Sequence, residues 1–167
     1  MAATATPKRG RGAGSWGALA AFLVVTYGVA ALGALAAADA GQVYSSLEKP
    51  SWAPPAWLFG PVWTLLYALI AVGAWLVWRH PNRPRVRSAL VWWWVQLVLN
   101  LAWTPLFFGA GQFGLALLDI GLLLGAVGVT SVLFHRLDRA AALLLGPYVA
   151  WVAFAAALNA AIWWLNT

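Results

Sequence analysis

Five long apolar stretches dominate this sequence and limit what the chain can fold into. They run over residues 17–38, 55–78, 88–108, 113–134 and 140–165. Each is long enough to cross a bilayer as a helix, because a hydrocarbon core of roughly 30 Å takes about 20 apolar residues. A β-barrel is disfavoured, because its strands alternate over roughly 10 residues and are not apolar throughout. The pattern predicts an all-α integral membrane protein built as a bundle of five transmembrane helices.

The residues between these stretches give the expected organisation of the chain. We expect a basic tail over residues 1–16, a single membrane domain over residues 17–165, and within it an outer loop over residues 39–54. The first stretch is longer than the apolar core of a signal peptide, which spans roughly 7–15 residues. It is therefore expected to stay in the protein as the first span.

The positive charges lie almost entirely on one side of the predicted bundle. The tail and the connections after the second and fourth spans carry nine of the ten Lys and Arg residues. The loop over residues 39–54 carries only Lys49. The positive-inside rule then predicts a cytoplasmic N-terminus and a C-terminus on the outer side.

The basic cluster from Arg79 to Arg87 is open to three interpretations. It can fix the orientation of the chain, bind anionic lipid headgroups, or contact nucleic acid. The first interpretation is favoured, because the unequal charge of the two sides of the bundle already indicates an orientation of the chain. Anionic lipid attracts such segments in any case. We therefore expect membrane lipid, and no nucleic acid, among the partners.

The composition excludes several kinds of chemistry. The chain has no cysteine and two histidines, which rules out disulfides, thiolate metal sites and cysteine nucleophiles. A metal site needs at least three converging ligands, and the sequence offers no such set. No acid–base pair or nucleophile supports ordinary catalysis. We expect no metal, no required cofactor and no conventional catalytic residues.

Polar and aromatic residues recur at four-residue intervals in three of the spans, so each set shares one helix face. The sets are Trp63 and Tyr67, then Gln96, Asn100 and Thr104, and finally Trp151, Ala155 and Asn159. One interpretation is interhelical hydrogen bonding, worth about 0.6 kcal/mol for each bond on average. The other is the lining of an internal cavity. Three such faces beneath an aromatic loop, which carries Trp52 and Trp57, favour the cavity.

Two further features of the fourth span have competing interpretations. Asp119 is an intramembrane carboxylate, which is by default a functional candidate. It has no cationic partner in the membrane, so a neutral carboxyl, or one bonded to a tyrosine or an amide, is favoured over a proton relay. The pair Gly121 and Gly125 permits close helix approach, either within the bundle or between two copies of the chain.

Several long motifs resemble the tryptophan-rich sensory protein/translocator protein family, the family of the peripheral-type benzodiazepine receptor. The motifs are LEKPSWAPP at 47–55, FGPVWTLLY at 59–67, QLVLNLAWTPLFFG at 96–109, ALLD at 116–119, PYVAWVAFA at 147–155 and LN at 158–159. The resemblance covers about residues 17–165. Their number and spacing make the resemblance highly specific.

The resemblance implies a homodimeric five-helix bundle that binds porphyrins, sterol-like lipids and synthetic isoquinoline or benzodiazepine ligands below the first loop. Carried over to the matching positions, the ligand-binding residues are Tyr44, Trp52, Pro54, Trp63, Gln96, Asn100, Trp151 and Ala155. Flat aromatic faces suit stacking on a macrocycle, and a small residue at position 155 leaves room for it. In some bacterial relatives, the tryptophans matching Trp63 and Trp151 are implicated in light-driven porphyrin breakdown.

The chain departs from the family pattern at two places. Val43 precedes Tyr44, where many relatives have a tryptophan. The C-terminal segment NAAIWWLNT lacks the tyrosine and the following basic residue of the sterol-recognition pattern of animal members. Such patterns are weak even when they are present, and cholesterol binding is not an expectation for this chain.

The leading functional hypothesis is a membrane sensor or regulator that binds porphyrin-type tetrapyrroles and related hydrophobic ligands. One alternative is a transporter of tetrapyrroles or lipids, although transporters commonly contain internal repeats and none is visible here. Another is a light-dependent porphyrin-degrading enzyme that relies on Trp63 and Trp151. We expect a bacterial cell membrane as the location, with the mitochondrial outer membrane as the alternative.

Overall fold

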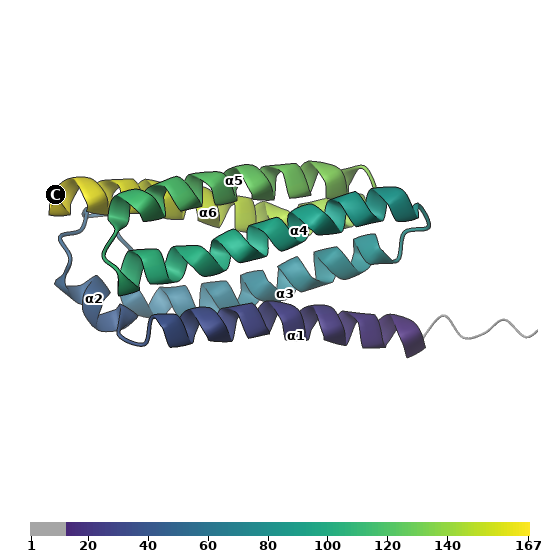
Figure 1. Ribbon diagram of the computed structural model, residues 1–167, viewed down its shortest axis with the longest axis horizontal. Coiled ribbons are helices and arrows are strands. Elements are labelled where there is room, and N and C mark those ends of the chain that lie inside the picture. Colours follow the sequence, from purple (N-terminus) through teal and green to yellow (C-terminus); the bar gives the residue numbers. More distant parts are fainter. Residues whose placement is uncertain (1–12) are drawn as a thin grey trace, which may run out of the picture.

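The computed structural model describes residues 13–167 and is entirely helical or looped over that range. Five long helices run side by side in an elongated bundle (Figure 1): α1 (Ala13–Ala36), α3 (Phe59–Trp78), α4 (Arg83–Thr104), α5 (Phe113–His135) and α6 (Arg139–Asn166). All five are long and apolar enough to cross a membrane. The predicted fold class, an all-α membrane bundle with five spans, is confirmed.

The five long helices close into a ring. Helix α1 packs on α3 and α4, α3 also packs on α6, and α5 packs on both α4 and α6. A short helix, α2 (Ala40–Ser46), lies at the end of the bundle that also carries the C-terminus (Figure 1). The α3–α4 and α5–α6 connections lie at the opposite end, which we call the basic end because it holds Arg79 to Arg87 and Arg136 to Arg139.

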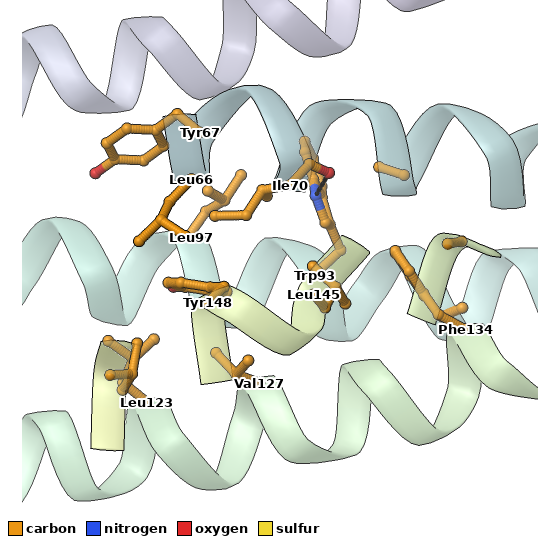
Figure 2. Packing of buried hydrophobic residues seen from close by; sticks show 14 of the residues in the cluster. Leu66, Tyr67, Ile70, Trp93, Leu97, Leu123, Val127, Phe134, Leu145 and Tyr148 are labelled. Atoms are coloured by element: carbon orange, nitrogen blue, oxygen red, sulfur yellow. Dashed lines mark hydrogen bonds between the residues drawn. The ribbon is translucent and has the colours of Figure 1, made fainter. Parts of the chain in front are cut away.

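The core lies between α3, α4, α5 and α6 (Figure 2). Its largest fully buried side chains include Trp93, Tyr148, Phe134 and Ile70. Helix α1 is attached more loosely, since Thr26 and Gly33 are its buried residues within the described range. The loose packing of α1 leaves space between this helix and the rest of the bundle.

The helix boundaries differ from the expected spans at the N-terminus and at the third span. Helix α1 starts at Ala13, so the last residues of the expected tail 1–16 are helical, while residues 1–12 lie outside the described range. Helix α4 starts at Arg83 instead of residue 88. Its N-terminus is set by Asn82, whose side chain accepts a hydrogen bond from the Arg85 N–H at 3.3 Å. This is an N-cap, which carries the helix beyond the apolar stretch into the basic end.

The expected outer loop, residues 39–54, is also partly helical. Its first half forms α2, and only the proline-bearing half from residue 47 to residue 55 is extended or turned. Pro55 has an extended backbone, with ψ of 147°, so a short 3₁₀ helix (Ala56–Leu58) precedes α3. The second span therefore becomes α-helical at Phe59 rather than at residue 55.

A proline also shapes the end of α4. At Pro105 the α-helix changes into a π-helix (Pro105–Gly109), because proline has no N–H to donate and its ring crowds the preceding turn. The chain then reverses through Gly111, whose φ of 62° favours glycine. This tight reversal brings the start of α5 beside the end of α4.

The glycine pair of the fourth span faces away from the bundle. A Cβ atom placed on Gly121 or Gly125 would meet no heavy atom within 4 Å among the described residues. An internal helix contact at this pair, one of the two interpretations of the motif, is therefore wrong. The open face remains available to lipid or to another protein surface.

The predicted orientation can be tested by labelling, because the native chain has no cysteine. Ser46 and Pro81 are both exposed, and they lie beyond opposite ends of α3. In intact cells, an impermeant thiol reagent is expected to label Ser46→Cys from outside, and to label Pro81→Cys only after lysis. Labelling of both positions before lysis would contradict a single crossing between them, and labelling of position 81 alone would reverse the orientation.

Candidate functional site: a cavity beneath α2

A cavity of about 510 Å³ lies at the α2 end of the bundle. All five long helices and α2 contribute to its wall. The lining residues are Tyr27, Ala30, Gly33, Ala34, Ala37, Ala38, Ala40, Gly41, Tyr44, Ala56, Phe59, Gly60, Trp63, Thr64, Tyr67, Asn100, Trp103, Thr104, Phe108, Ile120, Leu123, Trp151, Val152 and Ala155. None of these side chains is acidic or basic, so the cavity suits an uncharged, largely apolar group.

Aromatic rings from α3 and α6 form one wall of the cavity. Trp63 lies 5.4 Å from Tyr67, measured between ring centroids. Phe59 contacts Trp151 edge-on, with 5.8 Å between the centroids. These contacts fix the rings in place, and rings held in this way offer preformed surfaces for stacking.

Small residues on α1 and α6 leave space beside these aromatic rings. On α1, Ala30, Gly33 and Ala34 line the cavity. Gly33 and Ala34 follow Ala30 by three and four residues, so the three share one face of the helix. On α6, Ala155 follows Trp151 by one helical turn. Larger side chains at these positions would fill the cavity, so its volume depends on their size.

A chain of buried hydrogen bonds closes the deep end. The Tyr67 hydroxyl donates to Asn100 Oδ1 at 2.5 Å, and Asn100 Nδ2 donates to the Tyr148 hydroxyl at 3.3 Å. Tyr148 in turn donates to Gln96 Oε1 at 2.8 Å, and Gln96 Nε2 donates to the Trp93 carbonyl at 2.8 Å. The chain joins α3, α4 and α6 and satisfies groups that would be costly to leave unpaired in the membrane.

The roof of the cavity is α2, which is held down by Tyr44. The Tyr44 hydroxyl donates to the Pro54 carbonyl at 2.8 Å. Burial raises the pKa of Tyr44 above its ordinary value, so the hydroxyl stays protonated and remains a donor at neutral pH. Lys49 Nζ donates to the Tyr44 and Leu47 carbonyls at 2.7 and 2.6 Å, which satisfies free carbonyls at the end of α2.

The proline-rich part of the loop is also tied to the C-terminus of the chain. Asn166 Nδ2 donates to the Glu48 carbonyl at 2.9 Å, and the Glu48 N–H donates to Asn166 Oδ1 at 3.1 Å. The loop is therefore fixed at two points, at Tyr44 and at Glu48. These bonds hold α2 and the loop after it, which together we call the lid, at the end of the bundle where the cavity lies.

Five of the eight predicted ligand-binding residues line the cavity: Tyr44, Trp63, Asn100, Trp151 and Ala155. The other three lie nearby without lining it. Gln96 is one turn deeper and bonded to Tyr148, and Pro54 holds Tyr44 through its carbonyl. Trp52 packs edge-on against Phe154 at 5.7 Å and is 49% exposed, so it belongs to the outer surface of the lid.

The sequence interpretation missed the contribution of α1 and of the end of α4. Tyr27, Gly33, Trp103 and Thr104 all line the cavity. Thr104 belongs to the predicted cavity face of Gln96 and Asn100, although it is not among the ligand-binding residues that the resemblance implies. The signal on α1 is a face of alanine and glycine within a helix that is apolar all round, and such a face does not stand out from composition.

In the half of the bundle nearer α2, two buried polar atoms have no hydrogen-bond partner within the described residues. One is Trp151 Nε1, a donor in a residue that lines the cavity. The other is Asp119 Oδ2, in a side chain that is 8% exposed and does not line the cavity. The expected tyrosine or amide bond to this oxygen is absent from residues 13–167. In the same range no group of three or more His, Asp or Glu side chains is placed to hold a metal ion.

Comparison with known proteins agrees with this architecture. The TspO/MBR family matches residues 20–165. The human translocator protein is 44% identical over 122 residues, which is 72% of each chain. The tryptophan-rich protein TspO of Archaeoglobus fulgidus is 44% identical over 125 residues, or 74% of this chain and 79% of the relative.

A third relative extends the match along the sequence. The tryptophan-rich sensory protein of Cereibacter sphaeroides is 35% identical over 144 residues, which is 86% of this chain and 88% of the relative. The match of the family over residues 20–165 covers most of α1, nearly all of α6, and the whole of the chain between them. The chain is a multi-pass membrane protein that belongs to the TspO/MBR family.

Proposed function

We propose that this protein is a membrane sensor or regulator that binds a porphyrin-type tetrapyrrole, or a related flat hydrophobic molecule, in the cavity beneath α2. The observation that carries the proposal is the cavity itself. Its volume of about 510 Å³ falls within the range of roughly 300–1,000 Å³ typical of small-molecule sites. Membership of the TspO/MBR family is consistent with a ligand-binding role.

The lining favours recognition through stacking and shape. Trp63 and Trp151 supply flat aromatic surfaces, and no lining residue is a histidine, methionine or cysteine. Tyrosine can also ligate haem iron, but the three lining tyrosines, Tyr27, Tyr44 and Tyr67, each donate their hydroxyl to a protein oxygen. A metalloporphyrin would therefore be held by its ring rather than through its metal. The carboxylates that porphyrins carry find no cation in the lining, so they are expected to stay at the opening, toward the lid and water.

One residue of the lining carries a buried hydrogen-bond donor that lacks a partner within the described residues. Trp151 Nε1 is buried and unpaired within residues 13–167, and an unpaired buried donor costs roughly 1–3 kcal/mol. A ligand with an acceptor at this position would recover that cost. The cavity thus favours ligands that combine a flat apolar body with one acceptor at the edge.

The experiment that tests this proposal is a porphyrin titration of the purified protein, in the dark and under light. Quenching of tryptophan fluorescence is expected to saturate in the dark with the porphyrin intact. Steady loss of porphyrin absorbance under light, abolished in Trp63→Phe or Trp151→Phe, would instead make the protein a photochemical enzyme. Flux of porphyrin into sealed proteoliposomes would identify a transporter, and absence of saturable quenching would contradict the binding site.

We also propose the bacterial cell membrane as the location and a homodimer as the assembly. The location rests on the relatives from Rhodobacter capsulatus and Cereibacter sphaeroides, and on the helical spans. The dimer is supported by the open face around Gly121 and Gly125, where two helices could approach closely. Mass measurement in a mild detergent tests the dimer directly.

A further inference from the structure

A second cleft, of about 500 Å³, lies at the basic end, opposite the cavity beneath α2. It is formed by the start of α4 and the end of α5. Its lining residues are Pro84, Arg85, Ser88, Leu133, Arg136 and Leu137. Two guanidinium groups and one hydroxyl therefore share a small cleft with three apolar side chains, a combination that the proposed function does not use.

The two arginines of the cleft differ from other arginines at the same end. Arg79 lies over the Trp75 ring at 4.7 Å, and Arg83 lies over the Trp78 ring at 5.9 Å. Arg83 also donates to the Trp78 carbonyl at 3.1 Å. Within residues 13–167, the guanidinium groups of Arg85 and Arg136 have no comparable contact. They remain free to bind an anion.

Negative charge is scarce around the cleft. Asp138 is the one acidic residue of the basic end in the described chain. Its carboxylate accepts from the Ala141 N–H at 3.0 Å and thereby caps α6. The cleft consequently carries two exposed positive charges, and the nearest carboxylate in the sequence has a structural role.

The position of the cleft points to a lipid as the source of the anion. Its residues lie where two candidate spans end, since α4 starts at Arg83 and α5 ends at His135. Along α4, Trp92 and Val95 continue the face of Arg85 and Ser88 at helical spacing. Along α5, Val129 and Val132 do the same for Arg136 and Leu133. All four of these continuing residues are exposed, by 37% to 52%, so an apolar surface runs from the cleft into the membrane.

We propose that this cleft binds an anionic phospholipid. The phosphodiester would lie between the guanidinium groups of Arg85 and Arg136, with the Ser88 hydroxyl as an additional donor, and one acyl chain would follow the apolar surface between α4 and α5. Guanidinium groups bind phosphate oxygens through paired hydrogen bonds. The two arginines match the negative charge of the headgroup, and the apolar surface between α4 and α5 matches the acyl chain. A soluble anion would use only the arginines, so the cleft favours a lipid.

The test is native mass spectrometry of the protein in detergent, with phosphatidylglycerol added in increasing amounts and phosphatidylcholine as the neutral comparison. The native protein is expected to retain phosphatidylglycerol in preference to phosphatidylcholine. The double variant Arg85→Gln/Arg136→Gln is expected to bind phosphatidylglycerol about thirtyfold more weakly, since each of the two arginines contributes about 1 kcal/mol near anionic lipid. The matched control is Arg87→Gln/Arg139→Gln, which removes the same charge from exposed positions outside the cleft.

Each of three other results would overturn the proposal. Equal loss in the two double variants would mean a diffuse effect of charge rather than a site. Equal retention of the two lipids by the native protein would mean that the headgroup is not recognised, and this comparison does not depend on the folding of any variant. Displacement of the lipid by millimolar inorganic phosphate would make the cleft a site for free phosphate.

Discussion

Replacing Ala155 with leucine is expected to weaken porphyrin binding about tenfold. Ala155 is 9% exposed and lines the cavity one turn from Trp151. A leucine side chain there would occupy the space beside the indole ring and displace the ligand from it. Loss of about 60 Å² of apolar contact, at roughly 25 cal/mol per Å², corresponds to about 1.5 kcal/mol or a factor of ten. Fluorescence titration of the purified variant measures the change.

The matched control is Ala153→Leu. Ala153 lies two residues earlier on α6 and is exposed on the outer face of the bundle, so the same added volume has no cavity to fill. Its affinity for porphyrin is expected to equal that of the native protein. Ala141 is a poor control, because it is fully buried and its carbonyl lies close to Gly73. Equal affinities for the 155 and 153 variants would place the ligand outside the cavity.

Helical spacing predicted much of the α3, α4 and α6 walls of the cavity. Trp63, Asn100, Trp151 and Ala155 lie where three polar or aromatic faces converge. Such a signal exists because a polar group is costly in hydrocarbon, so its position on a helix reveals which side faces the interior. The same rule placed Gln96 on the correct face, although Gln96 does not line the cavity and its Oε1 accepts a hydrogen bond from the Tyr148 hydroxyl.

The wall formed by α1 could not be predicted in this way. Ala30, Gly33 and Ala34 differ little in polarity from the other residues of α1, so no face of this helix is marked in the sequence. Their role depends on size and on how α1 packs against α3 and α4. The same limit applies to the loop, where Trp52 faces outward and Tyr44 faces inward although both are aromatic. In each case packing decides, and packing is not visible from polarity.

The three consecutive tryptophans of α4 show this limit most clearly, and they lead to the largest expected effect on stability. Trp93 is 1% exposed, whereas Trp92 is 38% exposed and Trp94 is 49% exposed. Trp93 contacts Phe22 of α1 edge-on at 5.3 Å, and its Nε1 donates to the Ile70 carbonyl of α3 at 3.3 Å. One side chain thus joins α4 to two other helices (Figure 2 shows its place in the core).

Trp93→Ala is expected to lower the free energy of unfolding by about 3 kcal/mol, within the range seen when a large buried side chain is truncated. In a membrane the cost comes from lost packing and the unfilled cavity, since lipid is as apolar as the protein core. The control is Trp92→Ala, where lipid or detergent chains can fill the space, so a change within about 0.5 kcal/mol is expected. Unfolding by sodium dodecyl sulfate in mixed micelles measures both variants. Equal losses at the two positions would mean that Trp93 does not join α1, α3 and α4, and that the ring of helices is held together by other contacts.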